Sequence, residues 1–218
     1  QHYGCPVVAL LSNMDVPIGR ECGNANEVAE SVAALKGGGP PDLRELTLRL
    51  GAEMLVLGGA AKDVGAATAR LEAALTSGAA LAKFRELVAA QGGDPAVCDS
   101  PERVLPQPAR REPCRASRDG IVQRVNALVV GRGITTLGGG RETMEDSVDH
   151  AVGFTLAVRP GDRVRRGDVL AWTLARDDAG VAAGTVVLDE AIAIGDAPVT
   201  PPPLVSHRVT AGGVEWLS

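Results

Sequence analysis

The chain has 218 residues and a formal charge of −5 from 22 basic and 27 acidic side chains. This length accommodates one large domain or two small ones, and it buries a sizeable core without disulfides. Aromatic residues are scarce (two Trp, one Tyr and two Phe) and no basic cluster stands out, which disfavours nucleic-acid modules that stack bases on aromatic side chains. The four cysteines form no CxxC pair, and the apolar runs are too short to span a bilayer. We expect a cytoplasmic protein with reduced thiols that binds neither nucleic acid nor membranes.

The first part of the sequence predicts one strand and four helices. The continuous apolar run 6–11 is typical of a buried strand. A dense turn follows, after which Asn24 and Glu27 have the spacing of a capping box at the start of a helix. Apolar residues then recur at helical spacing through four helices within residues 24–92. Because the sequence enters its first strand almost at once and begins without Met, we interpret it as a piece of a longer chain.

The pattern changes after the fourth helix. Five prolines within residues 95–115 predict an extended linker. Short strand-like runs and two helical segments over residues 116–198 then predict a small α+β domain, and residues 199–218 an extended tail. The expected fold class is therefore α/β followed by α+β.

Three motifs of the second part favour structural interpretations. The segment LGGGRE (137–142) is similar to a phosphate-binding loop but lacks the GxGxxG and GKS/T spacings, so a tight turn is favoured. The segment 160–170 is similar to the turns of biotinyl and lipoyl carrier domains, which need a lysine, yet the last lysine is Lys83. His150 beside Asp149 is expected at the surface, because adjacent strand residues point to opposite faces.

The stretch SNMDVPIGRECGNANEVAES, residues 12–31, allows two interpretations. One is a well-capped connection between a strand and a helix. The other is a cation site, because a turn exposes backbone carbonyls and hard cations take oxygen ligands. Helical side chains lean toward the helix N-terminus, so Glu30 can point back over the loop, whereas Glu27 is better placed to cap the helix.

Several ordered motifs resemble thymidine and pyrimidine-nucleoside phosphorylases. The run ALLSNMDVPIGRECGNANEVAESVAALKGGGPPDLRELTLRLGAEML is similar to the stretch that follows their base-binding segment, and AAQGGDP, LGGGRET and DSVDHAVGF continue the resemblance in the same order. The resemblance implies a homodimeric enzyme that cleaves a pyrimidine nucleoside with phosphate as co-substrate and needs no organic cofactor. It also implies that residues 1–94 are the C-terminal part of the α/β domain and that residues 116–198 are a barrel-sandwich (hammerhead) domain.

The resemblance also implies which site residues are present. The phosphate loop and the residues that grip the base lie N-terminal to everything that matches here, so no residue of 1–218 is carried over as catalytic. Family members hold a monovalent cation, taken to be potassium, whose ligands fall on the carbonyls of Ile18 and Glu21 and on the carboxylate of Glu30. Met14 falls beside the base pocket, although a plain core methionine is an equal alternative.

Three positions depart from the family pattern. Asn26 replaces a leucine, Asn13 an aspartate, and Glu21 stands where a small residue is usual. We expect that residues 1–218 alone do not catalyse phosphorolysis. A stand-alone binding module and one half of a split enzyme are the alternatives.

Overall fold

The computed structural model describes residues 4–217, which divide into two compact units. Among the described residues, the first unit comprises residues 4–13, 33–93 and 202–217, and the second comprises residues 14–32 and 94–201. The fold is mixed α and β, and every strand pairing is antiparallel among the described residues. No helix within residues 4–217 combines the length and the apolarity needed to cross a membrane.

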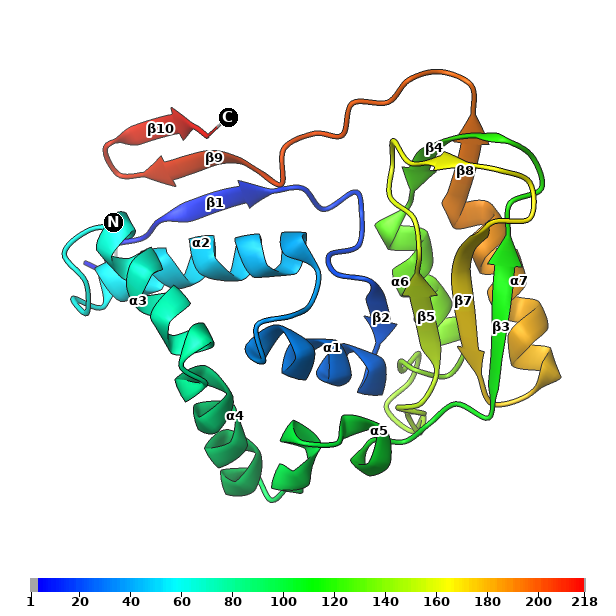
Figure 1. The fold of residues 1–218 in the computed structure, drawn as a ribbon, viewed down its shortest axis with the longest axis horizontal. Coiled ribbons are helices and arrows are strands. Elements are labelled where there is room, and N and C mark those ends of the chain that lie inside the picture. Colours follow the sequence, from blue (N-terminus) through cyan, green and yellow to red (C-terminus); the bar gives the residue numbers. More distant parts are fainter. Residues whose placement is uncertain (1–3, 218) are drawn as a thin grey trace. The chain divides into compact units, whose positions relative to one another are not determined.

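The first unit contains three complete helices and a small sheet (Figure 1). The sheet order is β1-β9-β10, so the amino-terminal strand pairs with a strand from the far end of the chain. The elements are β1 (Ala9–Ser12), α2 (Pro41–Leu57), α3 (Val64–Thr76), α4 (Ala79–Ala90), β9 (Val205–Thr210) and β10 (Gly213–Trp216). With α1 (Ala25–Leu35), these three helices make up the four that the sequence predicts within residues 24–92.

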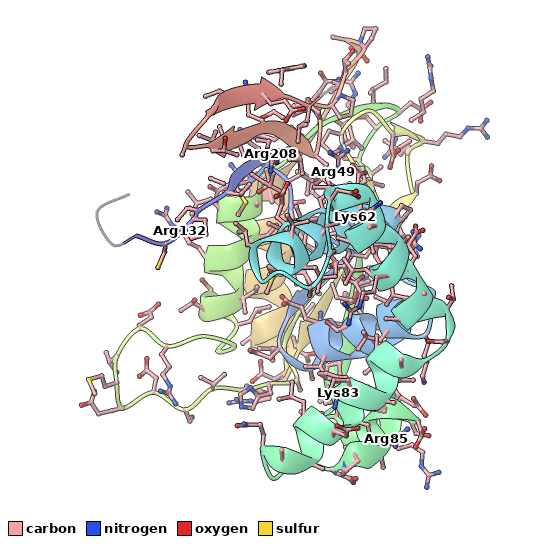
Figure 2. All side chains as sticks on the ribbon, turned by 90° about the vertical axis from the view of Figure 1, so that its left-hand side faces the viewer. Arg49, Lys62, Lys83, Arg85, Arg132 and Arg208 are labelled. Atoms are coloured by element: carbon pink, nitrogen blue, oxygen red, sulfur yellow. The ribbon has the colours of Figure 1, made fainter. Side chains whose placement is uncertain are left out.

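An ion pair joins α2 to the sheet of the first unit. Arg208 of β9 donates to both carboxylate oxygens of Glu53, at 2.6 and 3.1 Å, and Glu53 is almost fully buried. Figure 2 labels Arg208 at the hairpin formed by β9 and β10. A bidentate guanidinium–carboxylate pair fixes orientation as well as charge, so the hairpin has one defined face toward α2.

The second unit contains two antiparallel sheets, ordered β2-β5-β7-β3 and β6-β4-β8. Its strands are β2 (Glu21–Gly23), β3 (Arg110–Arg115), β4 (Gly120–Val125), β5 (Gly153–Leu156), β6 (Arg163–Val164), β7 (Val169–Ala175) and β8 (Ile192–Gly195). Its helices are most of α1, the 3₁₀ helix η1 (Pro95–Cys98), α5 (Pro101–Val104), α6 (Ala127–Thr136) and α7 (Asp178–Ala191). Fully buried side chains form one core, among them Phe154, Leu156, Val122, Val125 and Leu188.

Three expectations are wrong in part. The supposed linker 95–115 holds η1, α5 and strand β3, which pairs with β7 along its whole length. The supposed tail 199–218 holds the hairpin of β9 and β10. The buried strand predicted over residues 6–11 forms only at Ala9–Ser12, and Val7, Ala9 and Leu11 of the predicted run are exposed rather than buried.

Candidate functional site

The loop between Met14 and Asn24 is held against strand β5 by two arginines of the second unit. The guanidinium of Arg159 donates to the carbonyls of Pro17 and Gly19. The guanidinium of Arg20 donates to the carbonyl of Ala157 at 3.0 Å, while the Arg20 carbonyl accepts from the Leu156 amide at 2.7 Å. The loop backbone around Ile18 is therefore fixed on both sides by charged donors.

The carboxylate of Glu30 lies on this loop, as its position on α1 predicts. One oxygen, Oε1, accepts from the backbone amide of Arg20 at 2.9 Å. The other, Oε2, lies 2.1 Å from the point where a Cβ on Gly19 would stand, and Gly19 itself has a φ of +68°. Only glycine meets both conditions without strain, so the sequence Ile18-Gly19 forms a cradle that the carboxylate fills.

Glu21 directs its backbone and its side chain differently. It lies opposite Thr155 in the pairing of β2 with β5, one residue after the hydrogen-bonded Arg20 and Leu156. Antiparallel pairs alternate between hydrogen-bonded and non-bonded positions, so the Glu21 carbonyl faces away from β5, and β2 is the edge strand of its sheet. The Glu21 carboxylate instead accepts from the Thr155 hydroxyl at 2.7 Å and from the Asn26 side-chain amide at 2.9 Å.

Two of the departures from the family pattern thus contact each other. Asn26 donates to Glu21 and, at 3.1 Å, to the carbonyl of Phe154. Both donors of its amide are satisfied, whereas its buried Oδ1 has no partner. A leucine at position 26 would leave the Glu21 carboxylate without one of its donors, so the two polar residues compensate for each other.

Cys22 follows Glu21 and is buried. Burial raises the pKa of its thiol to about 12, with the nearby carboxylate of Glu27 adding to the rise and Arg159 opposing it. A thiol with so high a pKa carries almost no thiolate at neutral pH. Cys22 is therefore a core residue and not a nucleophile, and all four cysteines are free thiols.

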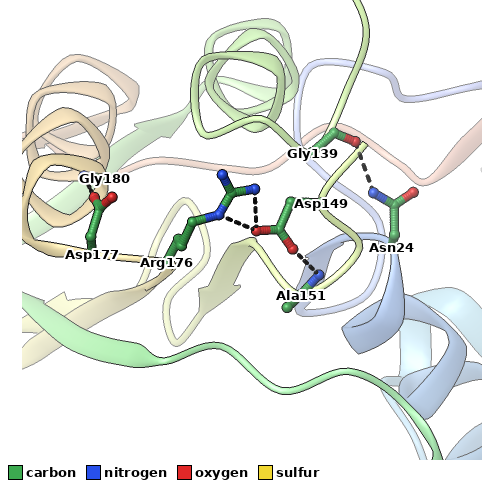
Figure 3. A network of polar contacts seen from close by, with 7 residues as sticks. All are labelled: Asn24, Gly139, Asp149, Ala151, Arg176, Asp177 and Gly180. Atoms are coloured by element: carbon green, nitrogen blue, oxygen red, sulfur yellow. Dashed lines mark hydrogen bonds and ion pairs between the residues drawn. The ribbon is translucent and has the colours of Figure 1, made fainter. Parts of the chain in front are cut away.

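The predicted capping box is only half correct. Glu27 does reach back, but its carboxylate accepts from the Gly23 amide at 2.8 Å rather than from that of Asn24. The side-chain amide nitrogen of Asn24 donates to the Gly139 carbonyl at 2.8 Å (Figure 3). The first amide of α1, that of Ala25, donates to the carbonyl of His150. The start of α1 is thus tied to segments more than a hundred residues away.

The glycine motif at 137–142 is a helix end, as expected, and not a phosphate loop. The amides of Gly138 and Gly139 donate to the carbonyls of Thr135 and Ile134 in the last turn of α6. These donors are unavailable to an anion, and the C-terminal end of a helix carries partial negative charge. The motif instead presents carbonyls, to Asn24 and to the Asp149 amide.

Figure 3 also shows how the segment before β5 is held. Asp149 accepts from the Ala151 amide at 3.0 Å and from two nitrogens of Arg176 at 2.8 and 2.9 Å. Burial alone raises the pKa of Asp149, but these donors outweigh it and hold the pKa below its ordinary value. Asp177, next to Arg176, caps α7 through the Gly180 amide. His150 is exposed, as predicted.

Met14 is 77% exposed, so the interpretation as a core methionine is wrong. Within residues 4–217, no group of three or more His, Cys, Asp and Glu side chains is arranged to hold a metal ion. The expected donor set is different in kind, because two of its three members are backbone carbonyls. Arg159 and Thr155 were not anticipated, since their bonds to the loop join distant parts of the sequence that carry no shared motif.

Comparison with known proteins agrees with this architecture. Residues 121–195 match the family model of the pyrimidine nucleoside phosphorylase C-terminal domain. Pyrimidine-nucleoside phosphorylases of Staphylococcus aureus strains USA300 and NCTC 8325 are each 41% identical to the chain over 200 residues, which is 92% of this chain and 46% of theirs. The chain thus spans about half the length of the curated relatives that it matches. The C-terminal part of this chain belongs to the pyrimidine-nucleoside phosphorylase family.

Proposed function

We propose that this chain serves the phosphorolysis of pyrimidine nucleosides, with thymidine as the substrate. In this reaction, phosphate oxygen forms a bond to C1 of the sugar as the bond from C1 to the base nitrogen breaks. The base leaves with the electron pair and takes up a proton, giving thymine and 2-deoxyribose 1-phosphate. The observation that carries the proposal is the 41% identity to pyrimidine-nucleoside phosphorylases over 92% of the chain.

The chain's part in this reaction is structural support. Two small antiparallel sheets enclose the core of the second unit, and these sheets support our proposal of a barrel-sandwich (hammerhead) domain over residues 116–198. Residues 1–94 complete part of an α/β domain. The assembled enzyme is a cytoplasmic homodimer that takes a nucleoside and phosphate and needs no organic cofactor.

Phosphorolysis needs groups that the described residues, 4–217, do not bring together. The phosphate nucleophile is held by a glycine-rich loop or by cationic donors, and charge on the leaving base is stabilised by positioned donors. In the glycine run 138–140, the amides of Gly138 and Gly139 bind carbonyls at the end of α6, and the Cys22 thiol is protonated at neutral pH. We therefore expect no turnover by residues 1–218 alone.

The cradle beside Gly19 supports a half-site for potassium. The carbonyls of Ile18 and Glu21 and the carboxylate of Glu30 are oxygen donors, which suit a hard monovalent cation. Glu21 offers its carbonyl because Asn26 and Thr155 hold its side chain in the sheet. A bound cation supplies positive charge against the Glu30 carboxylate. Two bonds within the chain fix the loop. The Arg20 amide donates to the Glu30 carboxylate, and the Arg159 guanidinium donates to the Pro17 carbonyl. Met14, exposed just before this loop, is proposed to line the base pocket.

Phosphate-dependent thymine release tests the proposed activity. The chain is co-expressed with the part of the S. aureus enzyme that it does not match, and thymidine consumption is followed in potassium and in sodium buffers. We expect release only from the assembled pair and only with phosphate. An assembled pair that leaves thymidine intact would contradict the proposed reaction.

The cation half-site is tested in the same assembly by Glu30→Ala. Potassium should stimulate the wild-type pair and should stimulate the Glu30→Ala pair much less. Glu27→Ala is the matched control, because Glu27 is an acid one turn earlier on the same helix that serves the Gly23 amide. Equal potassium dependence of the wild-type and Glu30→Ala pairs would remove Glu30 from the ligand set.

A further inference from the structure

Glu21 carries a carboxylate beside one of the proposed cation ligands. The ligand expected of this residue is its backbone carbonyl, which faces away from β5 at the edge of the sheet. The side chain leaves the same residue, so a full negative charge lies close to that carbonyl. The family pattern has a small residue at this position, so the charge is a feature of this chain. Because a carboxylate attracts a cation held at a neighbouring oxygen, Glu21 can act on the half-site through its side chain as well as its backbone.

The Glu21 carboxylate is held by two neutral donors of the second unit. The Thr155 hydroxyl of β5 donates to it at 2.7 Å, and the Asn26 side-chain amide of α1 donates at 2.9 Å. Neutral donors fix a carboxylate without cancelling its charge. Asn26 also donates to the Phe154 carbonyl at 3.1 Å, which ties the first turn of α1 to β5. The side chain of Glu21 is therefore braced from both the strand and the helix.

The packing of Asn26 shows that this arrangement costs free energy. Its buried Oδ1 has no partner among the described residues, and a buried acceptor without a partner is unfavourable. The same oxygen lies 2.5 Å from the point where a Cβ on Gly23 would stand, so the amide fits because Gly23 has no side chain. An unsatisfied buried group in a folded protein calls for an explanation. Here both N–H groups of the amide are directed at Glu21 and Phe154, which a leucine could not serve.

Further charges lie around the same strand. Burial raises the pKa of the Cys22 thiol most. Three carboxylates add to the rise and one guanidinium opposes it, namely those of Glu27, Glu21 and Glu30 and that of Arg159. Three acids and one arginine thus act on one buried atom next to Glu21. The charge on balance is negative, which favours a cation beside β2.

We propose that the Glu21 carboxylate strengthens cation binding at the half-site, and that Asn26 and Thr155 are the residues that position it. The inference rests on the proposed half-site and deepens it. It assigns to this chain a tighter grip on a monovalent cation than a chain with a small residue at position 21 would have. Glu30 and the carbonyls of Ile18 and Glu21 contact the ion, the Glu21 carboxylate adds its charge nearby, and Asn26 and Thr155 act through Glu21.

The test uses thallium(I), a monovalent ion that takes the place of potassium and has an NMR-active nucleus. Its signal is followed as the purified 218-residue chain is added, and competition by potassium checks that both ions share one site. Glu21→Gln keeps the shape of the side chain and removes its charge, so it should bind thallium about tenfold more weakly. Glu112→Gln is the matched control, because Glu112 is an exposed acid on β3, at the opposite edge of the same sheet. This control should bind like the wild type.

Thr155 separates a positioning role from plain stability. Thr155→Val removes the hydroxyl and keeps the shape, whereas Thr155→Ser keeps the hydroxyl. We expect Thr155→Val to weaken thallium binding several-fold and Thr155→Ser to bind like the wild type, under conditions where circular dichroism shows every variant folded. A structural role alone would lower the free energy of unfolding in urea and leave the affinity of the folded chain unchanged.

Three outcomes would overturn the proposal. One is a Glu21→Gln chain that binds thallium as tightly as the wild type. Another is equal affinity of the Thr155→Val and Thr155→Ser chains. The third is a wild-type chain that leaves the thallium signal unchanged. Thymine release by the assembled enzyme is scored separately, so an inactive assembly whose chain binds thallium in a Glu21-dependent way would sink the proposed reaction and leave this inference standing. An active assembly whose cation affinity ignores Glu21 would do the reverse.

Discussion

Gly19→Ala probes the contact between the loop and Glu30 most sharply. The new Cβ would lie 2.1 Å from Glu30 Oε2, and Gly19 has a φ of +68°. The left-handed backbone costs an L-residue roughly 1–2 kcal/mol. The carboxylate must also swing away and give up the Arg20 amide, and a charge-assisted bond that is partly exposed is worth about 1 kcal/mol. The free energy of unfolding should therefore fall by about 2–3 kcal/mol.

Gly138→Ala is the matched control for this substitution. Gly138 has a φ of +89° and no atom within 4 Å of its ideal Cβ, so it incurs only the backbone cost of roughly 1–2 kcal/mol. Urea unfolding followed by Trp172 fluorescence in a Trp216→Phe background measures both variants, because Trp172 lies on β7 of the same unit. In a Glu30→Ala background the extra cost of Gly19→Ala should vanish. Equal costs for the two glycine variants with Glu30 intact would refute the contact.

Three further predictions concern neighbouring groups. Asn26→Leu should lower the free energy of unfolding by about 1–2 kcal/mol because the Glu21 carboxylate loses a donor, and adding Glu21→Ser should restore most of it in a urea double-mutant cycle; strictly additive costs would contradict the compensation. Iodoacetamide at pH 8.5 should label exposed Cys5 and spare Cys22, whose thiol pKa of about 12 keeps it protonated. Labelling is read by peptide mass spectrometry, and a labelled Cys22 would contradict this prediction. Asp149→Asn should destabilise the chain by about 1 kcal/mol at pH 7. The Asp149 pKa is depressed in the fold, so this stability is present above the ordinary pKa near 4 and disappears as pH falls through the folded value; a cost that is the same at pH 7 and pH 3 would refute the sign.

The helices were predictable because their signals are local. Apolar spacing and the glycine breaks of residues 24–92 define α1 to α4 within a residue or two. Strand β3 was missed because proline discourages strands in general. Pro113 is tolerated here since β3 is the edge strand of its sheet, where one row of amides needs no partner.

The parts that escaped prediction depend on contacts between distant residues. The hairpin of β9 and β10 is ordered against β1, nearly two hundred residues earlier in the sequence. Within the candidate site, the direction of Glu30 followed from helix geometry, because it depends on a single helix and the loop before it. The anchoring of the loop by Arg159 did not, since 140 residues separate Arg159 from Gly19. The bond from the Asn24 side-chain amide to the Gly139 carbonyl is another such case, because the two residues are far apart in the sequence.

Phosphate-dependent release of thymine from thymidine, measured side by side for the purified chain and for its co-expressed complex with the remainder of the S. aureus enzyme, tests the central claim most directly. The account predicts no release by residues 1–218 alone and potassium-stimulated release by the complex. Turnover by the chain alone, or an assembled complex that is inactive in potassium and phosphate, would contradict it.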